Sequence, residues 1–260
     1  MSGNARFNTE AASWDNNPSV QEATRLAFDT LKPKIEELSH RKKAIQPKST
    51  GLDVLEVGCG TGLLTLRVAP LVNEIVALDP AEGMIEVLKG KVDTVTSTCQ
   101  TETELEPRRG GKNITPLCTL LTDPEDSILP PADPTNSNPI SPRKNYDLIL
   151  SHLVLHHVPD LKQFLATLLL CLTPGGRVAL TDFEDFGPEA IKFHPPRKLE
   201  GVERHGIKKG WIEGVMREVG FVDVSVYAGW TLDKKVDEWE GHKEGDTMEF
   251  PFLVVEGGRP

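Results

Sequence analysis

The stretch L-D-V-L-E-V-G-C-G-T-G, residues 52–62, decides the fold of this chain. Its apolar first half predicts a short buried strand, which leads into glycines at positions 58, 60 and 62 and then into an apolar helical pattern. Glycine lets the backbone turn sharply and approach a ligand closely, because no Cβ intervenes. The start of the following helix offers free N–H groups and a partial positive charge. The stretch therefore predicts a turn that binds a nucleotide-type ligand.

The spacing of the glycines indicates which nucleotide. A dinucleotide turn has the spacing G-x-G-x-x-G, and Leu63 stands here where its third glycine would fall. Glu56 precedes Gly58 by two positions, which suits an ammonium better than a pyrophosphate. S-adenosylmethionine carries an amino acid end and no phosphate, so the pattern favours it over NAD. A glycine turn of purely structural use stays open as an alternative.

A second strand ends in an acid that can serve the same ligand. The run E-I-V-A-L-D, residues 74–79, places Asp79 twenty-one positions after Gly58, and Pro80 follows. An acid at the end of the second strand of a βαβ unit can accept hydrogen bonds from both ribose hydroxyls. Asp79 could equally cap the next helix, since acids suit a helix N-terminus. Both roles can hold together, and the interval favours ribose binding.

Four motifs together resemble class I S-adenosylmethionine-dependent methyltransferases. They are V-L-E-V-G-C-G-T-G (54–62), I-V-A-L-D-P-A-E-G-M-I-E-V (75–87), Y-D-L-I-L-S-H-L-V-L-H-H-V-P-D (146–160) and L-T-P-G-G-R-V-A-L-T-D-F (172–183). Two flanks, F-N-T-E-A-A-S-W-D-N-N-P (7–18) and G-V-E-R-H-G-I (201–207), are similar to the fungal small-molecule branch. That branch includes thiol methyltransferases of dithiol natural products of the gliotoxin type.

The resemblance implies where the cofactor lies. Leu121 and Thr122 would flank the adenine, Ser151 and His152 would lie near the methionine part, and Trp14 resembles an aromatic that folds over the cofactor. A structural role in the core is the alternative for Trp14. Residues 1–45 would form a helical cap over the cofactor site, and residues 46–260 the methyltransferase core. The expected cofactor-binding residues are Trp14, Glu56, Gly58, Cys59, Gly60, Gly62, Asp79, Pro80, Leu121, Thr122, Ser151 and His152.

Periodicity and turn residues predict an α/β fold. The expected strands cover residues 52–57, 74–79, 114–121, 146–151, 177–182, 221–230 and 248–256, and the expected helices 19–38, 62–70, 81–92, 160–172 and 207–219. Their alternation predicts a single doubly wound, mostly parallel seven-stranded Rossmann-like sheet, with an antiparallel edge hairpin at the C-terminus. The segments between them read as a polar stretch at 7–17, an exposed connection at 93–113, a proline-rich loop insertion at 123–145 and a turn at 174–176.

Composition limits the class of partner. The formal net charge of −10 disfavours nucleic acid, whose binding depends on Lys and Arg. No apolar run approaches the ~20 residues that span a bilayer, and no secretory signal is visible. The cysteines at 59, 99, 118 and 171 lack metal-site spacing and read as reduced packing residues. We expect a cytoplasmic, metal-independent protein with a small-molecule substrate, as a monomer or weak homodimer.

Transfer of a sulfonium methyl group needs mainly orientation and a deprotonated acceptor. His205, in a polar loop that matches the family, is the first candidate base, and His152 is the second. His156, His157 and His194 are further candidates, and the acids Asp182, Glu184 and Asp185 could raise the pKa of a nearby histidine. The acceptor could be a thiol, as the flanks suggest, or an oxygen or nitrogen. A non-catalytic regulatory protein that binds S-adenosylmethionine and an NAD-dependent oxidoreductase remain as alternatives.

Overall fold

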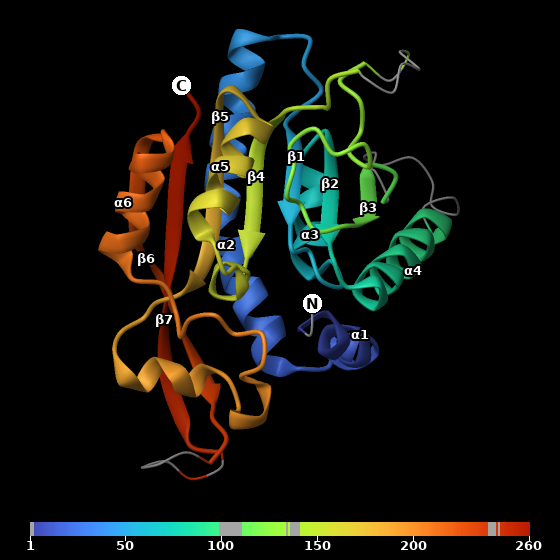
Figure 1. The fold of residues 1–260 in the computed structure, drawn as a ribbon. Coiled ribbons are helices and arrows are strands. Elements are labelled where there is room, and N and C mark those ends of the chain that lie inside the picture. Colours follow the sequence, from blue (N-terminus) through green and yellow to red (C-terminus); the bar gives the residue numbers. More distant parts are fainter. Residues whose placement is uncertain (1–2, 99–110, 134, 136–140, 239–242, 244) are drawn as a thin grey trace.

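Seven strands form one sheet in the order β3-β2-β1-β4-β5-β7-β6 (Figure 1). The computed structural model describes residues 3–98, 111–133, 135, 141–238, 243 and 245–260. The strands are β1 Asp53–Val57, β2 Glu74–Asp79, β3 Ile114–Cys118, β4 Tyr146–His152, β5 Leu172–Phe183, β6 Val222–Lys235 and β7 Thr247–Gly258. The first five pair in parallel, whereas β7 runs antiparallel to both β5 and β6. The predicted α/β fold and its C-terminal antiparallel hairpin are confirmed.

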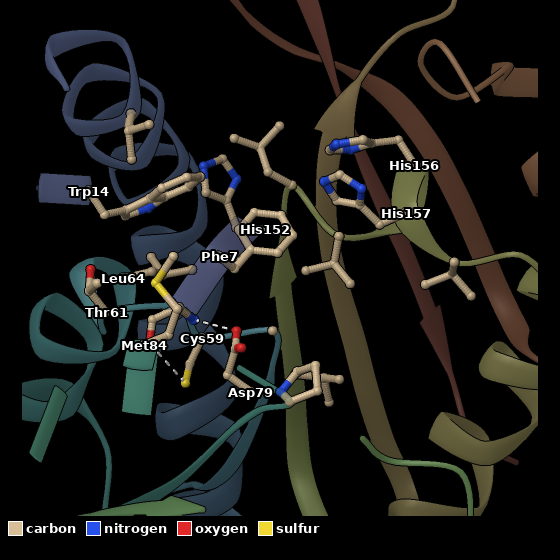
Figure 2. A pocket seen from close by; sticks show the side chains of 18 of the residues that line it. Phe7, Trp14, Cys59, Thr61, Leu64, Asp79, Met84, His152, His156 and His157 are labelled. Atoms are coloured by element: carbon tan, nitrogen blue, oxygen red, sulfur yellow. Dashed lines mark hydrogen bonds between the residues drawn. The ribbon is translucent and has the colours of Figure 1, made fainter. Parts of the chain in front are cut away.

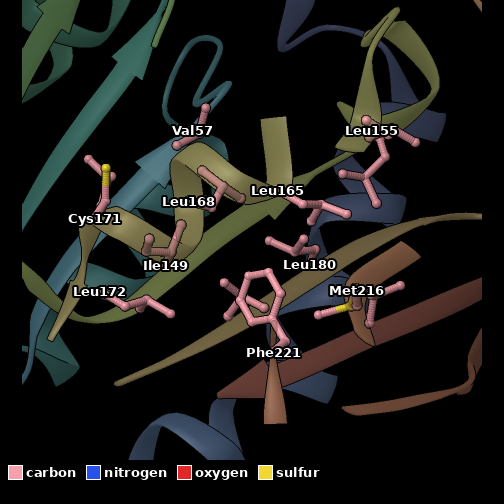
Figure 3. Close-up of a cluster of buried hydrophobic side chains, with 14 of the residues drawn as sticks. Val57, Ile149, Leu155, Leu165, Leu168, Cys171, Leu172, Leu180, Met216 and Phe221 are labelled. Carbon is pink, nitrogen blue, oxygen red and sulfur yellow. The ribbon is translucent and has the colours of Figure 1, made fainter. Parts of the chain in front are cut away.

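Helices cover both faces of the sheet. They are α1 Gly3–Trp14, α2 Pro18–Ile45, α3 Leu63–Val68, α4 Glu82–Thr98, α5 Leu161–Cys171 and α6 Lys209–Val219, with short 3-10 turns η1 Ala69–Leu71, η2 Leu155–His157, η3 Pro188–Phe193 and η4 Pro196–Lys198. One core contains Leu31 of α2 and Leu64 of α3. The other contains Leu165 of α5 and Met216 of α6 (Figure 3). Within the described chain, none of these helices has the length and apolar character that crossing a bilayer requires.

The N-terminal segment is helical where we expected a polar stretch. Phe7, Ala11 and Trp14 recur at helical spacing and pack with Ala81 and Met84 at the start of α4. The residues between Phe7, Ala11 and Trp14 are mostly polar, so the sequence pattern did not reveal this short apolar face. Asn17 caps the start of α2, and the helix continues to Ile45, seven residues beyond the end that we expected at residue 38. The division into a cap of residues 1–45 and a core of 46–260 stays a prediction.

Two element boundaries differ from the expectation for physical reasons. Tyr146 pairs with Leu172 but Leu148 pairs with Arg177, so residues 173–176 bulge from within β5 and do not precede it. β3 ends at Cys118, which is exposed and therefore does not pack in the core as we expected. Cys59 and Cys171 are buried, in agreement with the prediction. Cys99 and much of the expected connection at 93–113 lie outside the described residues.

The proline-rich loop is more than a surface insertion. Leu129 is 1% exposed and belongs to the same core cluster as Leu121, Val57 and Leu78. An antiparallel bridge between Pro131 and Arg143 closes the loop above it. Parallel strands usually need a helical crossover to connect them, and that crossover covers the sheet. In the described part of this connection, Leu129 of the loop packs in the same core as Val57 of β1 and Leu78 of β2, so the loop insertion contributes a buried residue to the core.

We expect Leu129→Ala to destabilise the fold by about 2–4 kcal/mol, because it removes a fully buried side chain from the main core. Its neighbour Ile128 is 41% exposed, so Ile128→Ala serves as the matched control and should cost well under ~1 kcal/mol. Urea unfolding followed by circular dichroism measures both. Equal effects of the two substitutions would contradict the packing role of the loop.

Candidate functional site

A pocket of about 560 Å³ opens at the carboxyl ends of β1, β2 and β4. This volume lies within the range of small-molecule sites, and parallel α/β sheets bind their ligands at this edge. Figure 2 shows Cys59 and Asp79 at one end of the pocket, with His156 and His157 at the other. Phe7 and Trp14 reach in from α1, so the N-terminal helix forms part of the pocket wall.

The three glycines after β1 have different functions. All three have positive φ angles, of 76° at Gly58, 54° at Gly60 and 82° at Gly62. A Cβ on Gly58 would lie 2.2 Å from a methyl group of Val154, and one on Gly62 would lie 2.3 Å from Leu88. A Cβ on Gly60 would meet no atom of the described residues within 4 Å. Gly58 and Gly62 therefore permit close packing, while Gly60 faces the open pocket.

Asp79 fixes the shape of the glycine turn. Its two carboxylate oxygens accept hydrogen bonds from the backbone N–H groups of Gly60, at 2.9 Å, and Ala81, at 2.8 Å. Burial raises the pKa of Asp79, and these two hydrogen bonds oppose that shift. One side chain thus caps the start of α4 and braces the turn, and it also lines the pocket.

Glu56 is a buried acid beside this turn. Its side chain is 2% exposed and accepts a 2.7 Å hydrogen bond from the hydroxyl of Thr65. Burial raises the pKa of Glu56 to about 8; the Thr65 bond lowers it and the charge of Asp79 raises it further. The carboxyl group is therefore largely protonated at neutral pH, and a cation entering the pocket would favour its ionised form.

The end of α1 is tied to the glycine turn. The hydroxyl of Thr61 donates a 2.5 Å hydrogen bond to Asp15, and Lys91 of α4 pairs with the same carboxylate. Lys91 also donates to the backbone carbonyl of Thr61, at 2.7 Å. Sequence reasoning did not identify Asp15, because a single acid before a helix gives no signal of its distant partner.

Three histidines gather at the opposite end of the pocket. The ring Nδ1 of His156 lies 2.8 Å from a carboxylate oxygen of Asp182. The two oxygens of this carboxylate also accept hydrogen bonds from the backbone N–H groups of His156 and Phe183. The ring Nδ1 of His157 donates to the carbonyl of Gly201, at 2.7 Å. The ring of His194 lies 5.0 Å from that of His156, between centroids. The η2 turn and the end of η3 supply these rings.

Burial controls the charge of this group. It lowers the pKa of His156 to about 3, of His157 to about 4 and of His194 to about 2, with nearby positive charges adding to the shift. The charge of Asp182 does raise the pKa of His152 and His157, as the sequence suggested, but the loss of hydration outweighs this attraction and the net shift is downward. Burial likewise raises the pKa of Asp182, which its N–H donors oppose. The three rings are therefore neutral at physiological pH.

The two candidate bases lie in different places. His152 lines the pocket, and its Nδ1 lies 2.8 Å from the hydroxyl oxygen of Thr181. Its Nε2 has no hydrogen-bond partner among the described residues, and burial lowers the pKa of this ring to about 4. His205 is half-buried and is not among the described residues that line the pocket. Its role as a base stays a prediction.

Most of the expected cofactor-binding residues share the pocket. Those that line it are Trp14, Glu56, Gly58, Cys59, Gly60, Asp79, Pro80, Leu121, Thr122 and His152. Ser151 and Gly62 are not among the lining residues that the structure describes. Ser151 donates its hydroxyl to the carbonyl of Val57 at 2.8 Å, so it supports the end of β1. Whether the lining residues contact a cofactor stays a prediction.

Residues 55–178 match the family model described as a methyltransferase domain. The chain is 24% identical over 161 residues to a Schizosaccharomyces pombe protein named uncharacterized methyltransferase C1347.09, covering 61% of this chain and 49% of that protein. It is 26% identical over 132 residues to the ubiquinone biosynthesis O-methyltransferase of Bradyrhizobium sp., covering 51% of this chain and 40% of that enzyme. The chain thus spans no more than about half the length of these two relatives.

A solved structure with the same fold is a Thermotoga maritima S-adenosylmethionine-dependent methyltransferase, described as a possible histamine N-methyltransferase. It aligns with a TM-score of 0.53 at 17% identity, covering 98% of this chain and 97% of that chain. The magnesium protoporphyrin IX methyltransferase of Synechocystis, solved with bound S-adenosylmethionine, aligns with a TM-score of 0.51 at 16% identity, covering 94% of this chain and 85% of the other. Residues 55–178 are thus similar to a methyltransferase domain, and the chain has the fold of S-adenosylmethionine-dependent methyltransferases, which supports S-adenosylmethionine as its cofactor.

We expect Asp79→Ala to weaken S-adenosylmethionine binding about tenfold or more. The substitution removes the charge-assisted hydrogen bonds that shape the glycine turn and the acceptor proposed for the ribose. Asp233→Ala, which changes an exposed acid on β6, is the control. Isothermal titration calorimetry measures both affinities, and parent-like binding by a folded Asp79→Ala protein would show that the turn does not hold the cofactor.

A second prediction concerns Glu56. At pH 7 we expect cofactor binding to release up to about one proton, because the cofactor ammonium lowers the raised pKa of this carboxyl group. The release should fade above pH 8, where Glu56 is already ionised, and should vanish in Glu56→Gln. Calorimetry in two buffers of different ionisation enthalpy counts the protons. Glu82→Gln, at the exposed start of α4, is the control; unchanged proton release in Glu56→Gln would separate Glu56 from the ammonium.

Proposed function

We propose that this protein transfers the methyl group of S-adenosylmethionine to a small-molecule acceptor. The observation that carries the proposal is the continuity of one pocket from the open face of Gly60 to the histidines beyond β4. The first end has the turn and the acids that suit the cofactor. The second end has room and polar groups for an acceptor, so donor and acceptor can meet without crossing solvent.

Methyl transfer from a sulfonium does not require the protein to form a covalent intermediate. The sulfonium is already an activated electrophile, so orientation and exclusion of water supply much of the rate. The nucleophile must approach in its deprotonated form, and a neutral histidine can take the proton. His152 offers a ring nitrogen without a partner among the described residues for this role, and burial, which lowers its pKa to about 4, makes it a weak base. The hydroxyl of Thr181 lies 3.4 Å from the carbonyl of Ser151 as a donor, which leaves a lone pair for the Nδ1–H of His152 and keeps Nε2 free to accept a proton.

The acceptor atom is the open part of the proposal. The flanking motifs around Trp14 and His205 are similar to thiol methyltransferases, which supports sulfur. The names of the curated relatives support oxygen, since one acts in ubiquinone biosynthesis and another, 36% identical over 99 residues, on malonyl-acyl carrier protein. We therefore propose a thiol or hydroxyl acceptor ahead of a nitrogen. A cytoplasmic location and a monomer or weak homodimer stay predictions from the sequence.

A non-catalytic protein that binds the cofactor is the alternative from another class. Calorimetry with S-adenosylmethionine, S-adenosylhomocysteine and NAD, followed by a mass-spectrometric product screen over thiols, phenols and amines, separates the two. We expect binding of the first two ligands and a methylated product. Cofactor binding without product from any acceptor class would support the regulatory alternative, and selective binding of NAD would overturn the proposal.

A pH–rate profile tests the base. With a thiol acceptor, His152→Ala should lower kcat by ~10-fold to 100-fold, and the deficit should shrink above the thiol pKa of ~8–9, because solvent then supplies the thiolate. With a phenol or alcohol, the loss should reach ~10²–10⁴-fold and persist to higher pH. In the parent, His152 stays neutral above about pH 4, so its own ionisation should not limit the rate at neutral pH.

The same measurement on His205→Ala judges the first-ranked sequence candidate, and His40→Ala, on the exposed side of α2, is the control. A profile identical to the parent at every pH would remove the substituted histidine from the mechanism.

A further inference from the structure

We propose that His156, His157 and His194 form a binding site for one divalent transition-metal ion in the wall of the pocket. One ring nitrogen from each of the three lies within 4.8 Å of the other two. In a tetrahedral zinc site with Zn–N bonds of about 2.0–2.1 Å, ligand nitrogens lie roughly 3.3 Å apart. This proposal departs from the metal-independent protein that the sequence led us to expect.

Two of these histidines each have a ring nitrogen that is available to bind a metal ion. His156 is 1% exposed, and its Nε2 has no hydrogen-bond partner among the described residues; the same is true of Nδ1 in His194. A buried polar atom without a partner costs free energy, so such atoms call for an explanation. Because Nδ1 of His157 is used by the Gly201 carbonyl, its Nε2 is the atom left for an ion. Two ring nitrogens without a partner, beside a third histidine ring, point to a common ligand.

The second ring nitrogens of His156 and His157 make the hydrogen bonds that are usual in metal-binding histidines. A ligating histidine usually donates its other N–H to a carboxylate or a backbone carbonyl, which fixes the tautomer and the ring. Asp182 fulfils this for His156, at 2.8 Å, and the carbonyl of Gly201 for His157, at 2.7 Å. Asp182 also accepts two backbone N–H groups, so its carboxylate is held in place by its own neighbours.

The charge state of the rings agrees with this geometry. A histidine binds a metal through its neutral imidazole, and burial lowers the pKa of all three rings well below neutrality. The positive side chains Arg6 and Lys234 also line the pocket and oppose a cation. The buried carboxylate of Asp182 lies directly behind His156 and offsets part of that repulsion.

The donor set selects the class of ion. Three imidazole nitrogens suit Zn²⁺ and related transition metals rather than Mg²⁺ or Ca²⁺, which prefer oxygen. Three protein ligands leave a fourth position open, as in catalytic zinc sites. All three histidines line the same pocket as the glycine turn, so an ion held by them would lie at the acceptor end. Resting on the proposed function, an acceptor hydroxyl or thiol that binds there would lose its proton to solvent more readily before it attacks the methyl carbon.

Metal binding to the chelator-treated protein tests the site directly. We expect the parent to bind one equivalent of Zn²⁺ by calorimetry and one of Co²⁺ with the visible absorption of a tetrahedral complex. Asp182→Asn should weaken binding by about 10- to 100-fold, and His194→Ala, which removes a ligand, by at least as much. His40→Ala, which removes an exposed histidine from α2, should bind like the parent. Circular dichroism checks that each variant is folded.

Two results would overturn the site: a parent that binds no stoichiometric Zn²⁺ or Co²⁺, or a folded His194→Ala that binds the metal like the parent. Calorimetry with S-adenosylmethionine and the acceptor screen, run on the chelator-treated and the Zn²⁺-loaded parent, separates this proposal from the proposed function. Methyl transfer by a protein that binds no metal would remove the metal site alone. Stoichiometric metal binding without methyl transfer to any acceptor would remove the proposed function and leave the site.

Discussion

The carboxylate of Asp79 holds together the part of the molecule on which the site depends. It connects the turn after β1 to the start of α4 by accepting one N–H from each. The turn can take this path only because Gly58, Gly60 and Gly62 adopt positive φ angles. Two of them let Val154 and Leu88 pack against the backbone, and the third leaves the space open for a ligand. The backbone around Gly58 and Gly62 is therefore tightly packed, and the pocket opens beside Gly60.

The second end of the pocket is organised by another buried acid. Asp182, the penultimate residue of β5, binds His156, which follows the neighbouring strand β4. Parallel strands bring their carboxyl ends to one edge of the sheet, so residues that are 26 positions apart meet there. The backbone N–H groups of residues 203 and 204 donate to the carbonyl of His156 and fix the η2 turn from outside. These contacts keep the neutral histidines close together in a buried region, where little water is present to stabilise a charged ring.

The cover of the pocket and of the sheet comes from segments with weak sequence patterns. α1 contributes Phe7 and Trp14, whose rings lie 5.7 Å apart, and Asp15 ties its end to Thr61. On one face of the sheet, Leu129 of the proline-rich loop fills space over β1 and β2. In both cases a few apolar residues within a polar stretch do the packing. The N-terminal helix and an irregular loop thus complete the cover of the pocket and of the sheet (Figure 1).

The sequence by itself determined the alternation of strands and helices in the α/β core, the glycine turn and the acids Glu56 and Asp79, because these depend on local periodicity and on spacing within one βαβ unit. Only the tertiary structure decided that Leu129 is buried, that Ser151 supports β1 and that His194 joins His156 and His157. Their partners lie far along the chain, and pattern carries no information about such contacts. The same holds for charge: the sequence suggested an acid that raises a histidine pKa, and Asp182 does so at His152 and His157, but burial, which exists only in the folded protein, lowers both pKa values by more.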